Sequence, residues 1–126
     1  MSKYLEYAQA AIKGLKNPDL VIEGWVNEAK IELGVLDEVS LAEVLRRKEI
    51  CSQCPFNSIL AKESKEYLEL FNENYSTERN ELHCSICACP IKTKTASLHS
   101  NCGLEHYNNK HPENKQELKW ESFKNQ

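Results

Sequence analysis

The sequence predicts a mainly α-helical protein that carries a small cysteine-rich module of the zinc-ribbon type. Two observations lead to this fold class. Apolar residues recur at helical spacing through residues 1–50. All six cysteines lie between residues 51 and 102, and they include two Cys-x-x-Cys pairs. We therefore expect a helical part at 1–50, a metal-binding module at 51–104 with a helical insert at 58–71, and a polar tail at 105–126.

The first expected helix ends before Pro18. Its apolar face is formed by Tyr4, Leu5, Ala8, Ala11, Ile12 and Leu15. Residues 16–18 end this helix and start the next one. Asn17 can cap the second helix, and Pro18 suits its first turn because an N–H at that position would need no helical partner.

The second helix is expected at about 18–33 and ends at Gly34, a residue that tolerates the left-handed conformation of a helix end. One face carries Val21, Trp25, Ala29 and Leu33, with Ile22 and Val26 beside them. We expect this face to pack in the core. The alternative is a docking surface around Val21, Trp25 and Leu36.

A third, short helix is expected from Ser40 into Cys51. Ser40 and Glu43 have the spacing of a capping box, in which each side chain accepts a hydrogen bond from the other's backbone N–H. Near the end of this helix lie Arg46, Arg47 and Lys48. We expect these cations to form a solvated helix end, where the helix dipole favours positive charge. Phosphate binding is the alternative.

Three further segments complete the expected structure. In residues 58–71 the apolar and the charged side chains fall on opposite faces at helical spacing, which predicts an amphipathic helix between the cysteine pairs. Residues 72–82 are polar and are expected to form a loop. Residues 88–95 alternate weakly and predict a short strand, which Pro90 confines to an edge. Trp120 and Phe123 are expected to anchor the polar tail.

The cysteine spacing predicts a metal site. In a Cys-x-x-Cys pair the two intervening residues turn the backbone back on itself, so that both sulfurs can reach one ion. A tetrahedral zinc site needs four such sulfurs at about 2.3 Å. The simplest site combines the two pairs, Cys51, Cys54, Cys84 and Cys87. Cys89 and Cys102 are then left over.

An alternative site uses these two remaining cysteines. Residues 87 and 89 point to the same side of an extended segment, so Cys89 can replace either partner of the second pair, and Cys102 can supply the fourth ligand. A second zinc would need more ligands or shared sulfurs, and His83, His99 and His106 could make up the number. We expect one Zn²⁺ per chain. An iron–sulfur cluster held by four thiolates is the chemical alternative.

The amino-terminal sequence and the cysteine usage favour the cytoplasm. The chain begins Met-Ser-Lys without an apolar signal region, and it contains no long apolar run. We therefore expect neither secretion nor a membrane span. In a reducing cytosol, Cys-x-x-Cys pairs are more often ligands or redox couples than disulfides. A thioredoxin-like role is not expected, because no βαβ pattern surrounds the cysteines.

A wider pattern, R-x3-C-x2-C…C-x2-C-x-C-x-I-x2-K…C, is carried by Arg47, Cys51, Cys54, Cys84, Cys87, Cys89, Ile91, Lys94 and Cys102. It resembles small cysteine-rich proteins of tailed bacteriophages and prophages, many from hosts of the Bacteroides group. Members typically end C-P-x-G-K-W and carry Gly where this chain has Ala88. Here Lys119 and Trp120 follow Cys102 only after an apparent insertion. The resemblance implies a zinc site, a viral origin and a location in the bacterial cytoplasm or the virion, but no activity.

The motifs separate two classes of function. The sequence lacks H-E-x-x-H, a Gly-rich phosphate loop and G-x-S-x-G, so we expect a non-catalytic adaptor of the virion or a binder of a host or viral protein. The second hypothesis is a nucleic-acid-binding regulator. Its positive patch would consist of Arg46, Arg47, Lys48, Lys92 and Lys94. The net charge of −3 counts against this hypothesis, although residues 84–126 hold six basic and four acidic side chains.

Overall fold

The computed structural model describes residues 18–122. The helix expected at 4–15, its boundary at Asn17 and the anchor Phe123 lie outside these residues. The elements are α2 (Pro18–Glu32), α3 (Glu38–Ser52), η1 (Leu60–Glu63), α4 (Lys65–Phe71), α5 (Ile91–Ala96), α6 (Leu104–Lys110) and η2 (Pro112–Asn114). The expectation of a mainly helical protein is confirmed. Within residues 18–122 the extended pairing is limited to two isolated bridges, Asn57 with Cys84 and His83 with Pro90.

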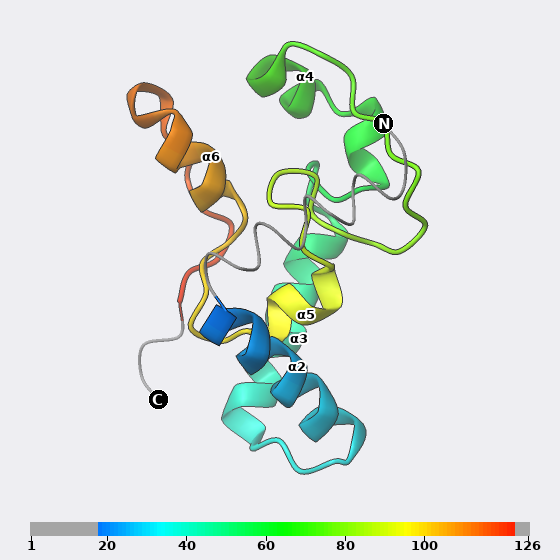
Figure 1. Ribbon diagram of the computed structural model, residues 1–126, viewed down its shortest axis with the longest axis vertical. Coiled ribbons are helices and arrows are strands. Elements are labelled where there is room, and N and C mark those ends of the chain that lie inside the picture. Colours follow the sequence, from blue (N-terminus) through cyan, green and yellow to red (C-terminus); the bar gives the residue numbers. More distant parts are fainter. Residues whose placement is uncertain (1–17, 123–126) are drawn as a thin grey trace.

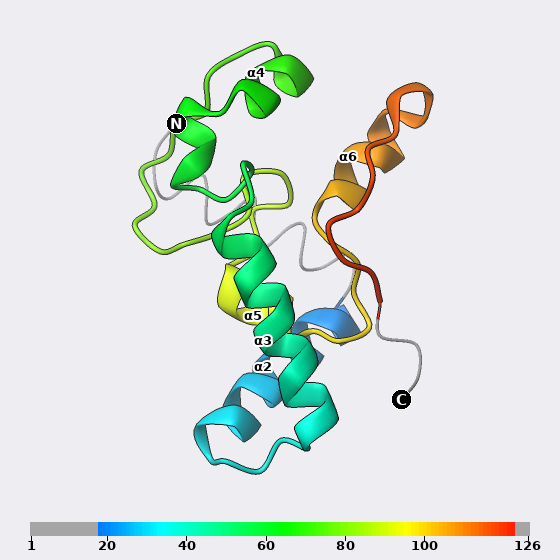
Figure 2. The same ribbon diagram turned by 180° about the vertical axis from the view of Figure 1, so that it is seen from behind.

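The helices group at two ends of the molecule. Helices α2 and α3 both pack against the short α5 at one end, and α4 and α6 lie at the other end (Figures 1 and 2). The larger core cluster surrounds cysteines and contains Cys51, Phe56, Ala61, Tyr67, Ile86, Ile91, Cys102, Leu104, Tyr107 and Trp120. A smaller cluster of Val44, Ala96 and Leu98 joins α3 to α5.

Helix α2 packs through its small and polar side. A Cβ atom on Gly24 would lie 2.5 Å from the backbone oxygen of Thr93, so only glycine allows this approach to α5. Asn27 donates a hydrogen bond to the Ala96 carbonyl at 2.8 Å. The opposite, apolar side is exposed, with Trp25 at 61% and Leu33 at 76%. The expectation that this face packs in the core is therefore wrong for the described residues.

The helix ends follow local rules with one correction. Gly34 ends α2 with a φ of +71°, as its position predicts. Helix α3 begins earlier than expected, because Asp37 is its cap and accepts a hydrogen bond from the Ser40 N–H at 2.9 Å. The expected capping box at Ser40 is wrong, since Ser40 is buried inside the first turn. The hydrogen bond from the Ser40 backbone lowers the pKa of Asp37.

Two expectations for the module are also corrected. The insert is not one helix: η1 and α4 are separated at Ser64, whose hydroxyl accepts a hydrogen bond from the Tyr67 N–H at 3.0 Å and caps α4. The expected strand at 88–95 is instead helix α5. Pro90 precedes its first residue with a φ of −56°, which is close to helical φ, and its carbonyl accepts a hydrogen bond from Lys94 at 2.9 Å.

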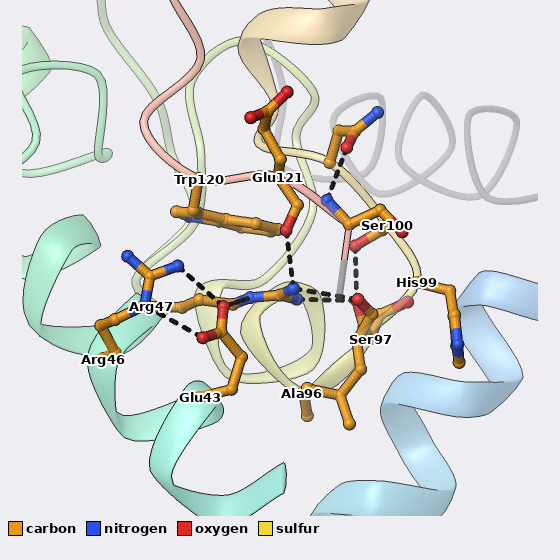
Figure 3. A network of polar contacts seen from close by, with 12 residues as sticks. Glu43, Arg46, Arg47, Ala96, Ser97, His99, Ser100, Trp120 and Glu121 are labelled. Atoms are coloured by element: carbon orange, nitrogen blue, oxygen red, sulfur yellow. Dashed lines mark hydrogen bonds and ion pairs between the residues drawn. The ribbon is translucent and has the colours of Figure 1, made fainter. Parts of the chain in front are cut away.

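Arg47 connects three distant parts of the chain from the buried side of α3 (Figure 3). Its guanidinium is fully buried and pairs with Glu43 at 2.7 Å. It also donates hydrogen bonds to the carbonyls of Ser97 at 3.1 Å, Leu98 at 2.9 Å and Glu121 at 2.9 Å. The Trp120 ring lies over it, with 4.4 Å between the ring centroid and the guanidinium carbon. The expectation that Arg47 belongs to a solvated helix end is wrong.

We predict that Arg47→Lys lowers the free energy of unfolding by about 2–4 kcal/mol, because an ammonium cannot reproduce the fork of hydrogen bonds and leaves buried carbonyls without donors. Arg46→Lys is the matched control. Arg46 pairs with the same Glu43 but is 55% exposed, and exposed ion pairs contribute only about 0–1 kcal/mol. Urea unfolding measures both variants, and equal losses would contradict the role assigned to Arg47.

Candidate metal centre

Four cysteines from three stretches of the chain line one small cavity. Cys51 lies at the end of α3, Cys54 in the turn that follows, Cys84 in a β-bridge, and Cys102 just before α6. The cavity has a volume of about 20 Å³. This is room for roughly one water-sized particle, and therefore for an ion but not for an organic cofactor.

The second Cys-x-x-Cys turn packs against Gly103. A Cβ atom on Gly103 would lie 2.6 Å from the sulfur of Cys84 and 3.0 Å from the sulfur of Cys87. The missing side chain thus allows both sulfurs to approach the backbone at this point. The Cys51 thiol is within electrostatic range of Cys102, Cys54 and Cys87. Four of the six expected ligands therefore line the cavity, and Cys87 lies beside Gly103, which also lines it.

Backbone hydrogen bonds shape the first turn. The Cys54 N–H donates to the Cys51 carbonyl at 3.2 Å, and the Asn57 side chain donates to the same carbonyl at 2.8 Å. The Phe56 N–H points at the Cys54 sulfur, 3.5 Å away. Amides directed at sulfur stabilise the thiolate form of cysteine, which is the form that binds metals.

The second turn depends on a left-handed residue. Ala88 has a φ of +66°, and its N–H donates to the Cys84 carbonyl at 2.8 Å. This left-handed conformation favours glycine, so an alanine is strained here. The buried Arg79 supports the turn by donating a hydrogen bond to the Ala88 carbonyl at 2.8 Å.

Burial makes these thiols difficult to ionise without a cation. Burial raises the pKa of Cys51 to about 11, and only part of this effect is offset by the hydrogen bond from Trp120. It also raises the pKa of Cys54. A hydrogen bond between Cys84 and Cys87 raises the pKa of Cys84 and lowers that of Cys87. A bound cation would favour the thiolates, because its charge compensates for their removal from water.

Two lysines and one tryptophan surround the sulfurs. Lys94 and Lys119 both line the cavity. Burial alone would lower the pKa of Lys94, but the nearby thiolates, with Cys87 the strongest, raise it overall. The indole N–H of Trp120 lies 3.4 Å from the Cys51 sulfur. These donors and charges offset part of the negative charge that four thiolates would carry.

The remaining candidate ligands lie outside the cavity lining. Cys89 adjoins Cys87, and its sulfur lies 3.7 Å from the Cys87 carbonyl oxygen. His83 uses one ring nitrogen with the Tyr75 hydroxyl at 2.6 Å and the other with the Glu81 carbonyl at 2.9 Å. His99 is paired with Glu23 at 2.6 Å on the surface. His106 lies in α6 and does not line the cavity.

The six thiols are donors that suit a soft metal, although their sulfurs are not arranged around one ion position. All six thiols are free of disulfides, and thiolates are the ligands preferred by zinc and by iron–sulfur clusters. Within residues 18–122, no group of three or more His, Cys, Asp or Glu side chains has an arrangement that could hold a metal ion.

Several residues around the centre were not expected from the sequence as part of it. Gly103 directly follows Cys102 in the sequence. A glycine next to a candidate ligand could have indicated that cysteine sulfurs approach the backbone closely there. Trp120 was expected only as a tail anchor, yet it is 3% exposed and contacts the first cysteine. No local signal placed Trp120 there, because it is 69 residues away from Cys51 in the chain.

Comparisons of the chain with protein-family models, with curated proteins and with solved structures give no match. Across residues 18–122, every helix is too short or too polar to cross a membrane.

Proposed function

We propose that this protein is a small phage-encoded adaptor, without catalytic activity, whose cysteine module is organised by one Zn²⁺ ion. The observation that carries the proposal is the cavity shared by Cys51, Cys54, Cys84 and Cys102. Its size suits one ion, and its lining supplies four sulfurs. The phage origin is supported by the resemblance of residues 47–102 to cysteine-rich phage proteins.

The proposed ligands are Cys51, Cys54 and Cys102, with Cys84 or Cys87 as the fourth. Zinc would require each of these sulfurs at about 2.3 Å from the ion. A zinc ion with four thiolate ligands has no open position for water or substrate, which supports a structural role for the metal. An iron–sulfur cluster uses the same donors and is the chemical alternative.

We predict that Cys51→Ser and Cys102→Ser lose the metal and destabilise the protein by several kcal/mol, on the order of 3 or more, because metal binding and folding of the module are coupled. Cys89→Ser is the matched control, since Cys89 neither lines the cavity nor belongs to the proposed ligand set. It should cost about 1–2 kcal/mol or less. Chemical unfolding with and without a chelator measures all three variants.

The same series also identifies the fourth ligand. Of Cys84→Ser and Cys87→Ser, the variant that abolishes the chelator effect has lost a metal ligand. A Cys89→Ser variant as unstable as Cys102→Ser would contradict the proposed ligand set. A chelator that leaves the unfolding curve of the unsubstituted protein unchanged would contradict the metal itself.

The adaptor role is supported by apolar side chains exposed on the insert between the cysteine turns. Ile59 is 66% exposed, and Leu60 and Leu68 are each 43% exposed. These residues lie on η1, α4 and the turn before them, at the end of the molecule away from α2 (Figure 1). Exposed apolar groups of this kind mark protein-binding surfaces when they are close together. The expected partner is a protein of the virion or of the host.

We predict that a tagged copy of the chain, produced during infection by a phage that encodes it, sediments with virions or with one defined protein complex. Ile59→Asp should weaken this association, because it places a charge in the apolar contact. Glu69→Asp on α4 is the control and should leave the association unchanged. A protein that migrates as a free monomer throughout infection would contradict the adaptor role.

Nucleic-acid binding has weaker support, because most of the cations proposed for it are engaged. Arg47 is fully buried, and Lys94 lies beside the thiols. Lys92 is 3.7 Å from Glu28 and 3.4 Å from Glu32. Binding of DNA or RNA in a gel shift, weakening as salt rises, would restore this hypothesis.

A further inference from the structure

Helix α5 carries two lysines that face different parts of the molecule. The Lys92 side chain is 61% exposed and lies 3.7 Å from Glu28 of α2. Lys94 instead lines the cavity together with the four cysteines. Ile91, three residues earlier and therefore on the same side of the helix, is 6% exposed and lines the cavity as well. This side of α5 thus faces the candidate metal centre.

The positive charge of Lys94 lies close to the second cysteine turn. Of the cysteines, Cys87 acts most strongly on this charge, followed by Cys89 and Cys84, and the carboxylate of Glu105 has a weaker effect. Lys94 is only partly exposed, and among residues 18–122 it forms no ion pair with a carboxylate. A partly buried charge is screened less by water and salt than a surface charge. Its field therefore acts mainly on the sulfurs.

We propose that Lys94 is the countercharge of the metal centre, and that its ammonium acts through the sulfurs of the second turn to strengthen metal binding. This inference rests on the zinc centre proposed above. Neutral thiols add no charge to the metal-free protein, whereas four thiolates around one Zn²⁺ carry a net charge of −2. A fixed cation beside the sulfurs favours the metal-bound state, because it stabilises this added negative charge.

Lys119 supplies a weaker charge near the first cysteine turn. It also lines the cavity and acts on Cys54. It precedes Trp120, whose indole N–H lies 3.4 Å from the Cys51 sulfur. Lys119 is exposed, so water and salt screen its charge. The two lysines should therefore contribute unequally, and Lys94 should contribute more.

Cobalt substitution of the full-length protein tests the proposal. Co²⁺ enters the tetrahedral sites that zinc occupies, and its visible d–d bands report the coordination geometry. Its sulfur-to-cobalt charge-transfer band reports the electron density on the sulfurs. In Lys94→Met, which keeps an unbranched apolar stem and removes the charge, we expect this band to move to lower energy while the d–d bands stay unchanged. The affinity for Co²⁺ should fall roughly 10- to 100-fold, as it does for other residues that support ligands from outside the coordination shell.

Three further variants separate the charge of Lys94 from its packing. Lys94→Arg keeps the positive charge, so it should restore most of the affinity and of the band position. Lys92→Met is the matched control, because it makes the same change on the side of α5 that faces α2, and it should alter neither quantity. Lys119→Met should shift the band less than Lys94→Met does.

The outcomes distinguish this inference from the proposed centre. A normal cobalt spectrum that Lys94→Met leaves unchanged would overturn the role of Lys94 alone. A full-length protein that gives no cobalt spectrum would overturn the metal centre and this inference with it. Equal effects of Lys94→Met and Lys92→Met, or loss of the d–d bands in both Lys94→Met and Lys94→Arg, would show that packing and not charge is responsible. Loss of binding in Lys94→Met with rescue by Lys94→Arg would support the countercharge.

Discussion

The burial of several thiols around one small cavity is the constraint on which this fold depends. Cys51, Cys54, Cys84 and Cys102 come from three parts of the chain, which are joined by loops and very short helices. Loops of this kind supply little cooperative structure of their own, and a small core needs a further link between its segments. Thiolates around a shared cation would provide that link, because they would attach all three segments to one point.

Arg47 provides the second link, and it acts next to the first. Its hydrogen bonds connect α3 to the carbonyls after α5 and to the carboxy-terminal segment. The Trp120 ring that covers the guanidinium also directs its N–H at the Cys51 sulfur, and the Trp120 carbonyl accepts a hydrogen bond from the Cys102 N–H at 3.0 Å. A change at Arg47 is therefore transmitted to two proposed ligands through a single tryptophan.

The parts of the fold that the sequence could predict are those with local causes. Pro18 and Gly34 mark the ends of α2, and the Cys-x-x-Cys spacing marks the turns of the module. The expectation of a strand at 88–95 was wrong because eight residues with weak alternation suit a short strand and a short helix equally, and Pro90 is acceptable near the start of either. At α3, both Asp37 and Ser40 are suitable cap residues, and the Asp37 carboxylate is the one that caps the helix.

Other features depend on contacts between residues far apart in the chain. The charge of Arg47 suggested solvent, but acceptors 50 and 74 residues away in the chain allow its burial. The spacing of apolar residues in α2 indicates an apolar face. It does not indicate that the opposite face packs against α5, where Gly24 allows a close approach. Likewise, the spacing of the cysteines predicts turns that can bind a metal, but the inclusion of Cys102 in the cavity depends on how α6 and Trp120 pack.

The most direct measurement of the central claim is the metal content of the intact protein. Native mass spectrometry of the full-length chain, purified under reducing conditions, should give a mass one zinc ion above that of the polypeptide. Elemental analysis distinguishes this zinc from iron and sulfide. The added mass should disappear with a chelator, together with cooperative unfolding of the module. A folded protein at the bare polypeptide mass, with an unfolding curve that a chelator does not change, would contradict the account.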